Sequence, residues 1–290
     1  MAAIEVTHFS DPGCPWAYSA APHFAALRWR YGEQLRWRLV LIVLTEQARQ
    51  YVERGYTPQR QAVGYRRFRD RGMPFATAPR ERIAATAVAC RAIIATRLSD
   101  PVREWEAFRA LQFAWFTTTL VLDEPDAVAA ALQRVAGLDV GRVMGMLDAP
   151  EVGAAYDEDR RLARTAAGSP TEFQGKSANT DGAVRFTAPS LVFAAAGRTL
   201  EAGGFQSLGA YDVCVANLDT SLARREAPED VVDVLAALPE GLTTREVAAC
   251  LAPDKSAPDD AAAEDRLIAA VAEGRATRET LGSGALWSAA

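Results

Sequence analysis

The start of the chain alternates apolar and polar side chains and then changes to a helical period. Residues 4–9 alternate with a period of two, which predicts a strand. Residues 16–31 carry apolar side chains at helical spacing. Residues 35–44 begin by alternating and end as a continuous apolar run, which is typical of a buried central strand. We therefore expect the chain to open with a strand, a helix and a second strand.

A long helical stretch follows, punctuated by glycine and proline. From residue 45 to about residue 164 the pattern favours helices, with the clearest ones over 83–98, 101–120, 124–136 and 140–147. Residues 167–182 are rich in Gly, Ser, Thr and Asn and indicate a loop. We interpret residues 45–182 as an all-α insertion.

The rest of the chain predicts a closing ββα unit and a small additional module. Strands are expected at 184–193 and 198–202, and a helix at 206–218. After Pro228 the pattern predicts helices at 229–238, 243–251 and 261–273 and a hairpin at 275–287, an order that resembles a winged helix. The expected fold class is therefore α/β, with a core from residues 1–44 and 183–225, the insertion at 45–182, and a winged-helix-like domain at 226–290.

Composition narrows the class of protein. The chain has 290 residues, of which 49% are hydrophobic and 24% charged, as in ordinary globular proteins. We expect no membrane span, no signal peptide and a cytoplasmic location. Four scattered cysteines do not make a disulfide framework, and with two histidines and no Cys-x-x-Cys pair we expect no metal site. A cysteine of interest is then catalytic or simply buried.

Cys14 stands where the first helix is predicted to begin. Asp11-Pro-Gly-Cys14 breaks the first strand, and Pro15 suits the first helical position because it has no N–H to leave unpaired. The free N–H groups of a helix start favour a thiolate and lower a cysteine pKa to about 3.5–7.5. We therefore expect Cys14 to be the most reactive thiol, with a pKa well below the free value of about 8.5. The alternative is a buried structural cysteine.

The residues around Cys14 resemble a known active-site turn. Residues 9–17, Phe-Ser-Asp-Pro-Gly-Cys-Pro-Trp-Ala, closely resemble the turn of DsbA-like thiol oxidoreductases, which commonly has the pattern Asp-Pro-x-Cys-Pro-Trp-Cys. The resemblance implies a thioredoxin fold, with Cys14, Pro15 and Trp16 in the catalytic turn. Ala17 stands where the family has its second, resolving cysteine. The similarity covers roughly residues 4–222.

Two further stretches extend the resemblance. Thr187-Ala-Pro-Ser190 resembles the cis-proline loop of the family, which implies that Ala188 and a cis Pro189 face Cys14. Residues 65–75 and the helix carrying residues 84–95 are similar to 2-hydroxychromene-2-carboxylate isomerases and kappa-class glutathione transferases. Those relatives use a serine where this chain has Cys14, and they bind glutathione.

The resemblance implies a monothiol enzyme. Without a second cysteine in the turn, Cys14 can form a mixed disulfide but cannot complete an intramolecular step. A small thiol, glutathione or mycothiol, is then the expected co-substrate, with no tightly bound cofactor. The expected partners are this thiol or a thiol-containing substrate. A glutathione-type transferase or isomerase, and a non-catalytic binding protein that retains the fold, stay open as alternatives.

Other residues allow a functional and a structural interpretation. Trp115 and Phe116 are candidates to line a pocket over Cys14, or core residues of the insertion. Cys90 is a candidate resolving thiol, or a core residue on an apolar helix face. His8 and His23 flank the site in sequence and are candidates to tune the thiolate, or packed side chains. The arginines at positions 60, 66, 67, 69 and 71 suit an anionic ligand or a solvated helix face.

The C-terminal module lacks the charge that DNA binding needs. Residues 226–290 contain 13 acidic and 5 basic residues, a net charge of −8. DNA affinity comes largely from cationic contacts with phosphate. We therefore expect no nucleic-acid partner, and expect the apolar face of the module to pack against the rest of the chain or against a second copy, so a homodimer stays open.

Overall fold

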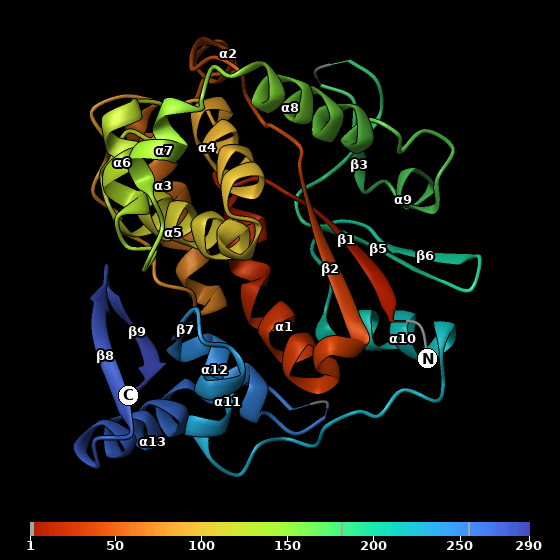
Figure 1. Ribbon diagram of the computed structural model, residues 1–290, viewed down its shortest axis with the longest axis vertical. Helices are drawn as coiled ribbons and strands as arrows, with labels where there is room; N and C mark the ends of the chain where they lie inside the picture. The colour runs from red at the N-terminus through yellow and green to blue at the C-terminus, as the bar shows by residue number, and fades with distance from the viewer. Residues whose placement is uncertain (1–2, 181, 255) are drawn as a thin grey trace.

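A four-stranded sheet forms the centre of the computed structural model, which describes residues 3–180, 182–254 and 256–290 (Figure 1). The strands lie in the order β2 (Leu35–Leu41), β1 (Ile4–Ser10), β5 (Ser190–Ala195) and β6 (Arg198–Ala202). β1 is parallel to β2, and β5 is antiparallel to both β1 and β6. This sheet is the one that a thioredoxin fold requires, and β6 has the predicted bounds.

Helices cover both faces of the sheet. On one face, Ile4 and Val6 of β1 pack with Phe24 of α1 (Pro15–Tyr31) and Tyr211 of α10 (Leu208–Leu218). On the other face, α8 (Pro150–Ala163) packs against β2. The Asp159 carboxylate of α8 accepts a hydrogen bond from the backbone N–H of Leu41 (2.9 Å), which fixes α8 to that strand.

The insertion is helical, as predicted, apart from a short strand pair at its end. Its helical elements are α2 (Arg49–Glu53), α3 (Pro58–Phe68), η2 (Arg69–Arg71), α4 (Ala87–Ser99), η3 (Pro101–Arg103), α5 (Glu104–Thr117), α6 (Pro125–Leu132), α7 (Val140–Gly145), α8 and α9 (Pro170–Phe173). β3 (Ser177–Ala178) pairs with β4 (Arg185–Phe186), and η1 (Gly32–Gln34) follows α1 directly. The strand expected over 184–193 is divided into β4 and β5, because the turn at residues 187–189 interrupts it.

The C-terminal module has the predicted three helices and hairpin. They are α11 (Val231–Ala237), α12 (Thr244–Leu251), α13 (Asp260–Ala272), β8 (Ala276–Leu281) and β9 (Gly284–Ala289), with β7 (Leu242–Thr243) completing a three-stranded sheet. Thr243 and Glu246 form the capping box that the sequence pattern indicates. The fold class predicted from the sequence is therefore confirmed.

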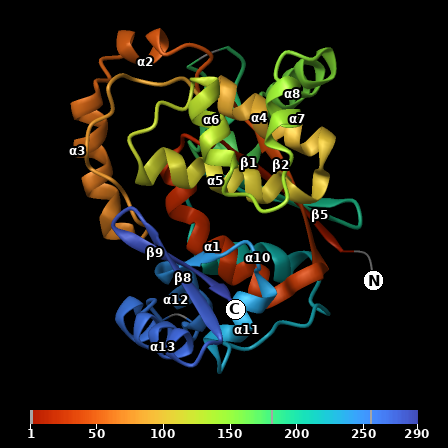
Figure 2. The same ribbon diagram turned by 60° about the vertical axis from the view of Figure 1, so that its left-hand side comes forward.

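The module packs on α1 rather than standing apart. Ala25 and Ala26 of α1 belong to one apolar cluster with residues of α11, α12 and β9, including Trp287. The hairpin turn reaches the insertion, where a Cβ at Gly282 would meet the Thr117 side chain at 2.8 Å (Figure 2). The body of the same chain therefore covers much of the apolar face of the module.

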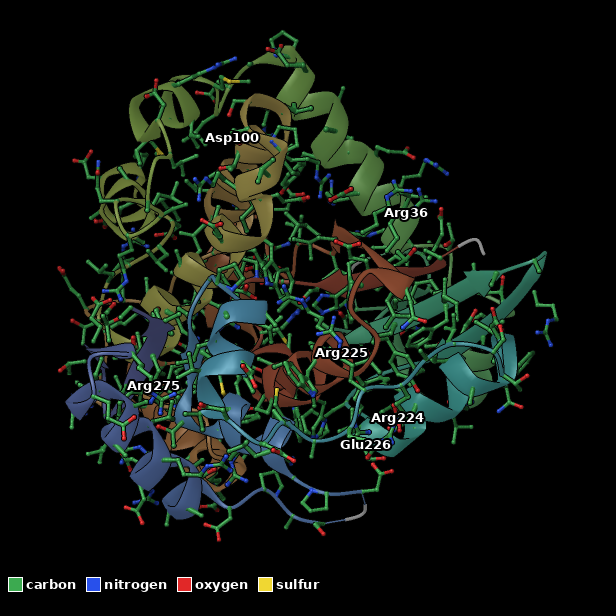
Figure 3. The ribbon with its side chains drawn as sticks, turned by 60° about the horizontal axis from the view of Figure 1, so that its bottom comes forward. Arg36, Asp100, Arg224, Arg225, Glu226 and Arg275 are labelled. Atoms are coloured by element: carbon green, nitrogen blue, oxygen red, sulfur yellow. The ribbon has the colours of Figure 1, made fainter. Side chains whose placement is uncertain are left out.

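The segment that leads into the module lies along α1. Arg224, Arg225 and Glu226 follow α10 on this segment (Figure 3). The backbone N–H of Arg225 donates to the carbonyl of Arg30 (2.8 Å), and the indole N–H of Trp29 donates to the carbonyl of Glu226 (2.9 Å). These bonds tie the connection to the same helix that begins at Cys14.

Candidate active site

Cys14 is the N-cap residue of α1 and lies against a loop from the other end of the core. Its backbone is extended, and Pro15 occupies the first helical position, as the sequence indicated. The Cys14 Sγ–H donates a hydrogen bond to the carbonyl oxygen of Ala188 (3.1 Å), 174 residues further along the chain. The Ala188–Pro189 peptide bond is cis. The structure thus brings Cys14, Ala188 and Pro189 together at the carboxyl end of β1 and the start of β5.

Burial of Cys14 overturns the expected acidity of its thiol. The side chain is 6% exposed, and burial raises the pKa of the Cys14 thiol to about 12, with the charge of Asp11 acting in the same direction. The backbone N–H groups of Ala17 and Trp16 oppose this rise. The predicted effect of the helix start is therefore present, but desolvation outweighs it. The expectation of a lowered pKa is wrong for this conformation, in which Cys14 is a protonated thiol.

Asp11 organises the turn in front of Cys14. Its carboxylate accepts hydrogen bonds from the N–H of Gly13 (2.8 Å), the N–H of Leu44 (2.8 Å) and the hydroxyl of Thr86 (2.9 Å). Burial raises the pKa of Asp11 to about 6, although these hydrogen bonds lower it. Asp11 is thus mostly ionised at neutral pH, and its negative charge disfavours the thiolate of Cys14.

A buried arginine and a tyrosine complete the electrostatic surroundings. Arg185 of β4 is buried, and its charge lowers the pKa of both Asp11 and Cys14. Tyr51 of α2 interacts electrostatically with the same two groups. The electrostatic roles of Asp11, Arg185 and Tyr51 were not predicted from the sequence. The one sequence feature that could have indicated Arg185 is its charge, which stands out in the otherwise apolar stretch before Pro189.

Trp16 forms the open side of the site. Its indole is 43% exposed and lies edge-on to Phe205 (5.7 Å between ring centroids) and Phe68 (5.0 Å). The guanidinium of Arg71 lies over the Trp16 ring, 4.4 Å from its centroid. An exposed cation, Arg71, therefore lies over the exposed aromatic face of Trp16, two residues after Cys14.

A family model described as the DSBA-like thioredoxin domain matches residues 5–188, which include the Cys14 turn and end at Ala188. The chain belongs to the DsbA-like thioredoxin family. The C-terminal module, residues 226–290, lies outside this match. Comparison with curated protein sequences finds no match.

Solved structures agree on the DsbA-like fold. A protein described as a probable DsbA oxidoreductase from Streptomyces coelicolor is 14% identical, with a TM-score of 0.57, covering 75% of this chain and 91% of its own. The cytosolic disulfide reductase DsbM from Pseudomonas aeruginosa is 18% identical, with a TM-score of 0.51, covering 75% of this chain and 98% of its own. A structure of DsbM with GSH matches equally well. At these identities the likeness establishes the fold.

The other residues predicted for this DsbA-like site are buried in the protein next to it. Ala17 is buried in the first turn of α1. Trp115 is buried against the turn. Its ring lies so close to Gly13 that a Cβ at that position would approach it to 3.0 Å. Phe116 is fully buried and stacks on Tyr18 (4.7 Å) in the core of the insertion. The expectation that Trp115 and Phe116 line a pocket over Cys14 is therefore corrected: both serve as packing residues.

The two histidines are packed side chains, and only one arginine of the predicted cluster lies beside the site. His8 packs in a cluster of aromatic rings under α1, and His23 packs against Phe205 (5.4 Å). Of the five arginines, the structure places Arg71 beside Trp16, whereas Arg60 donates to the carbonyl of Gly55 and Arg69 to that of Phe75. Arg66 and Arg67 are exposed. Most of this cluster is a solvated helix face.

All four cysteines of this family member carry free thiols. Cys90 is fully buried on α4, and its Sγ lies 3.8 Å from the Asp11 carboxylate. Burial raises its pKa well above the usual value.

Among the described residues, no group of three His, Cys, Asp or Glu side chains could hold a metal ion, and no described helix is long and apolar enough to cross a membrane.

The pH dependence of Cys14 labelling tests these electrostatics. Because its pKa is raised to about 12, the rate of labelling by iodoacetamide should rise about tenfold per pH unit from pH 7 to 9 with no plateau. Asp11→Asn removes the neighbouring negative charge, and we expect it to lower the pKa of Cys14 and to speed labelling several-fold at pH 8. Peptide mass spectrometry would follow Cys14 separately from the other thiols.

The matched control is Asp157→Asn, which removes an exposed carboxylate on α8. It should leave the labelling profile unchanged. A plateau with a midpoint below pH 8 in the unaltered protein would contradict the assigned role of burial.

Proposed function

We propose that the protein is a thiol-dependent oxidoreductase that acts through one nucleophilic cysteine, Cys14, with a small thiol as co-substrate. The observation that carries the proposal is the position of the Cys14 sulfur, between the first N–H groups of α1 and the cis Ala188–Pro189 bond. Pro15 fixes the start of the helix, and Pro189 orients the substrate disulfide or the thiol next to Cys14.

The chemistry is two thiol–disulfide exchanges. In the first, the Cys14 sulfur attacks a disulfide, a Cys14–S–S–R bond forms, the substrate S–S bond breaks, and the proton of Cys14 ends on the leaving thiol. In the second, a small thiol attacks the mixed disulfide, which regenerates the Cys14 thiol and releases a disulfide of R with the small thiol. Electrons balance because the small thiol is oxidised and the leaving thiol is reduced.

Burial determines when Cys14 reacts. In the free protein the thiol donates to the Ala188 carbonyl, and its raised pKa keeps it protonated. The N–H groups of Trp16 and Ala17 and the charge of Arg185 favour the thiolate once the proton leaves. This arrangement suppresses reaction with adventitious oxidants and makes reaction depend on a substrate that enters the site.

The Arg71–Trp16 pair favours a thiol that carries carboxylates. The Arg71 guanidinium is exposed and lies over the Trp16 ring. A guanidinium binds a carboxylate in a two-point geometry. Glutathione carries two carboxylates and suits this position better than mycothiol, which is the alternative co-substrate.

A second function is favoured by the protonated state of Cys14. A thiol that donates a hydrogen bond can hold a bound small thiol without becoming oxidised, as a glutathione-type transferase or isomerase requires. The raised pKa of Cys14 and the similarity of residues 65–75 to such enzymes support this candidate. It differs from the leading proposal because no disulfide forms on Cys14.

A cytoplasmic setting suits either chemistry. The free state of all four thiols supports it. The acidic C-terminal module, in which Glu264 and Asp265 are exposed on α13, supports the absence of a nucleic-acid partner. We propose that the module stabilises the helix that carries Cys14.

Glutathione-dependent reduction of 2-hydroxyethyl disulfide tests the proposal. Oxidised glutathione would be recycled by glutathione reductase, and the absorbance of NADPH would report its consumption. We expect activity in the unaltered protein, its loss in Cys14→Ser, and a several-fold higher KM for glutathione in Arg71→Gln.

Cys214→Ser is the control, because Cys214 is another free thiol on α10. It should keep the full rate. Equal activity of Cys14→Ser and the unaltered protein would overturn the proposal. Glutathione binding without turnover would favour the transferase or isomerase, and neither binding nor turnover would favour a non-catalytic binding protein.

A further inference from the structure

The outer side of α3 carries an exposed group of arginines. Residues 49–71 contain seven arginines and two carboxylates, a net charge of +5 in a chain whose net charge is −5. On α3 itself the exposed side chains include those of Arg60, Val63, Arg66 and Arg67, which we call the arginine face. Figure 2 shows α3 along the outer edge of the molecule. This segment is therefore cationic in a protein that is acidic overall.

The cations of the arginine face have no counter-charge within the described part of the chain. Arginines elsewhere are commonly paired with carboxylates, as Arg82 is with Asp123 (2.7 Å). No ion pair among the described residues involves Arg60, Arg66 or Arg67. A guanidinium without a carboxylate partner is available to an anionic ligand.

The arginine face is open to solvent. Val63, in its middle, is 41% exposed. A Cβ at Gly64 would have open space around it, with no neighbouring atom within 4 Å. α3 is anchored from its other side, where Ala62 and Tyr65 are buried. The face is thus accessible to a partner, and it offers an apolar side chain between cations.

The arginine face begins beside the Cys14 site. Phe68, at the end of α3, lies edge-on to Trp16, and Arg71 in the following turn lies over the Trp16 ring. A helix rises ~1.5 Å per residue, so Arg60 lies about 12 Å from Phe68 along the helix axis. An extended peptide covers that distance with about four residues. A polypeptide that presents a cysteine sulfur to Cys14 can therefore lay its neighbouring residues along the face.

We propose that the disulfide substrate of Cys14 is an acidic polypeptide segment, whose carboxylates bind the arginine face while its cysteine sulfur enters the site. The inference rests on the function proposed for Cys14 and adds the class of its substrate. Guanidinium groups bind carboxylates in a two-point geometry, and Val63 suits an apolar side chain between acidic ones. A cationic surface also raises the rate at which an acidic partner reaches the site.

A polypeptide suits this surface better than a nucleic acid does. The substrate has to bring a disulfide to Cys14, and a nucleic acid carries none. A long polyanion that continued past the end of α3 would also approach the C-terminal module, because a Cβ at Gly284 of its hairpin would meet Pro74 at 3.1 Å. That module has a net charge of −8 over residues 226–290. A short acidic segment avoids this repulsion.

Three peptides activated as 2-pyridyl disulfides test the inference on the full-length protein. The acidic probe is Glu-Glu-Gly-Cys-Gly-Glu-Glu, and the neutral and basic probes have Gln or Lys in place of every Glu. The Cys14 sulfur attacks the peptide sulfur, a disulfide forms between Cys14 and the peptide, and the activated S–S bond breaks. The leaving group takes the electron pair and the proton as 2-thiopyridone, whose absorbance reports the rate.

The rate above that of Cys14→Ser belongs to Cys14. We expect the acidic probe to react about tenfold faster than the neutral probe at low ionic strength, and the basic probe to react most slowly. Added salt should bring the three rates together, because it screens exposed charges.

Charge reversal on the face is a second measurement. Arg67→Glu should lower the rate with the acidic probe several-fold and raise the rate with the basic probe. Arg142→Glu is the matched control, because Arg142 is likewise exposed in the last turn of a helix, α7. It changes the net charge by the same amount outside the arginine face, and it should leave both rates unchanged.

Equal rates with the acidic and neutral probes at low ionic strength, or equal losses in Arg67→Glu and Arg142→Glu, would overturn this inference and leave the monothiol function standing. Absence of a Cys14-dependent rate with every probe would overturn both. Stronger inhibition of the acidic probe by an oligothymidine than by the peptide Glu-Glu-Gly-Ser-Gly-Glu-Glu at equal charge would assign the face to nucleic acid, which also overturns the inference.

Discussion

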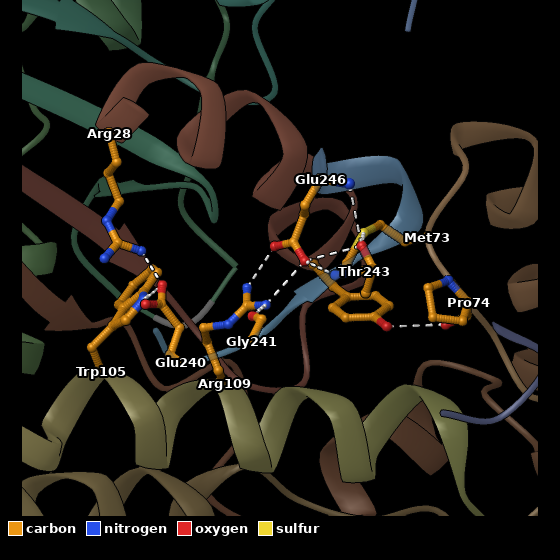
Figure 4. A network of polar contacts seen from close by, with 10 residues as sticks. Arg28, Met73, Pro74, Trp105, Arg109, Glu240, Gly241, Thr243 and Glu246 are labelled. Carbon is orange, nitrogen blue, oxygen red and sulfur yellow. Dashed lines mark hydrogen bonds and ion pairs between the residues drawn. The ribbon is translucent and has the colours of Figure 1, made fainter. Parts of the chain in front are cut away.

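Replacing Glu246 by alanine is expected to destabilise the protein by about 3–5 kcal/mol, because it leaves a buried arginine without its counter-charge. The Arg109 and Glu246 side chains are 5% and 1% exposed, and they form two hydrogen bonds of 2.6 and 3.0 Å between α5 and α12 (Figure 4). Arg109 also donates to the carbonyl of Gly241 (3.0 Å). A loss of this size is a large fraction of the ~5–15 kcal/mol that stabilises a typical domain.

Two further variants separate the charge from the helix cap. Glu246 also accepts a hydrogen bond from the N–H of Thr243 (2.8 Å), so its replacement by alanine removes part of the capping box. Glu246→Gln keeps a capping side chain and removes the charge, and it should still be strongly destabilised. Combining Arg109→Met with Glu246→Leu removes both charges and should cost much less than Glu246→Ala.

Urea unfolding followed by tryptophan fluorescence and circular dichroism measures these differences. In Glu246→Ala we also expect the module to loosen from α1 and to expose apolar surface around Ala25 and Ala26. A loss below about 1 kcal/mol in Glu246→Ala would contradict the view that the pair fixes the module, since exposed ion pairs contribute amounts of that size.

We expect Ala17→Cys to give dithiol activity well above that of the unaltered protein. Cys14 is the N-cap of α1, and Ala17 lies three positions further into the same turn. Side chains at this spacing are neighbours, with Cβ atoms about 5–6 Å apart, and modest adjustment brings two cysteines within disulfide range. The new thiol could then attack a mixed disulfide on Cys14, release the reduced substrate and leave an intramolecular disulfide between Cys14 and the introduced cysteine.

Reduction of insulin by dithiothreitol, followed by turbidity, measures this activity. We expect a large gain in Ala17→Cys and none in Ala17→Ser, which changes the same position without adding a thiol. Strong activity in the unaltered protein would show that another thiol resolves the intermediate. Cys90 would be the candidate, although Asp11 lies against it and it is fully buried.

Most of the fold was predictable from patterns among residues that are close in sequence. The alternation in β1, the proline at the start of α1 and the threonine–glutamate capping box of α12 each depend on residues close in sequence, and each appears where predicted. Boundaries shifted where a turn interrupted a regular pattern. The strand expected over residues 184–193 is divided because Thr187–Pro189 turns the chain.

The sequence predicted the two segments that meet at the candidate site, but it did not predict the electrostatics of Cys14 or the contributions of Arg185 and Tyr51. The turn at Cys14 and the loop at Pro189 were recognised by resemblance, and the structure joins them. The pKa of Cys14 depends on how much protein covers it, which no local pattern records. The contact of Arg109 with Glu246 joins residues 137 positions apart. Such features follow from the packing of segments that are distant in sequence.

Intact-mass analysis after exposure to oxidised glutathione tests whether Cys14 is the cysteine that forms a mixed disulfide. We expect one glutathionyl group per chain. Peptide mapping should locate it on Cys14, and it should be absent in Cys14→Ser and removed by reduced glutathione. A parallel exposure to oxidised mycothiol distinguishes the two small thiols. Failure of both disulfides to modify Cys14, or modification of Cys90, Cys214 or Cys250 in its place, would contradict the account.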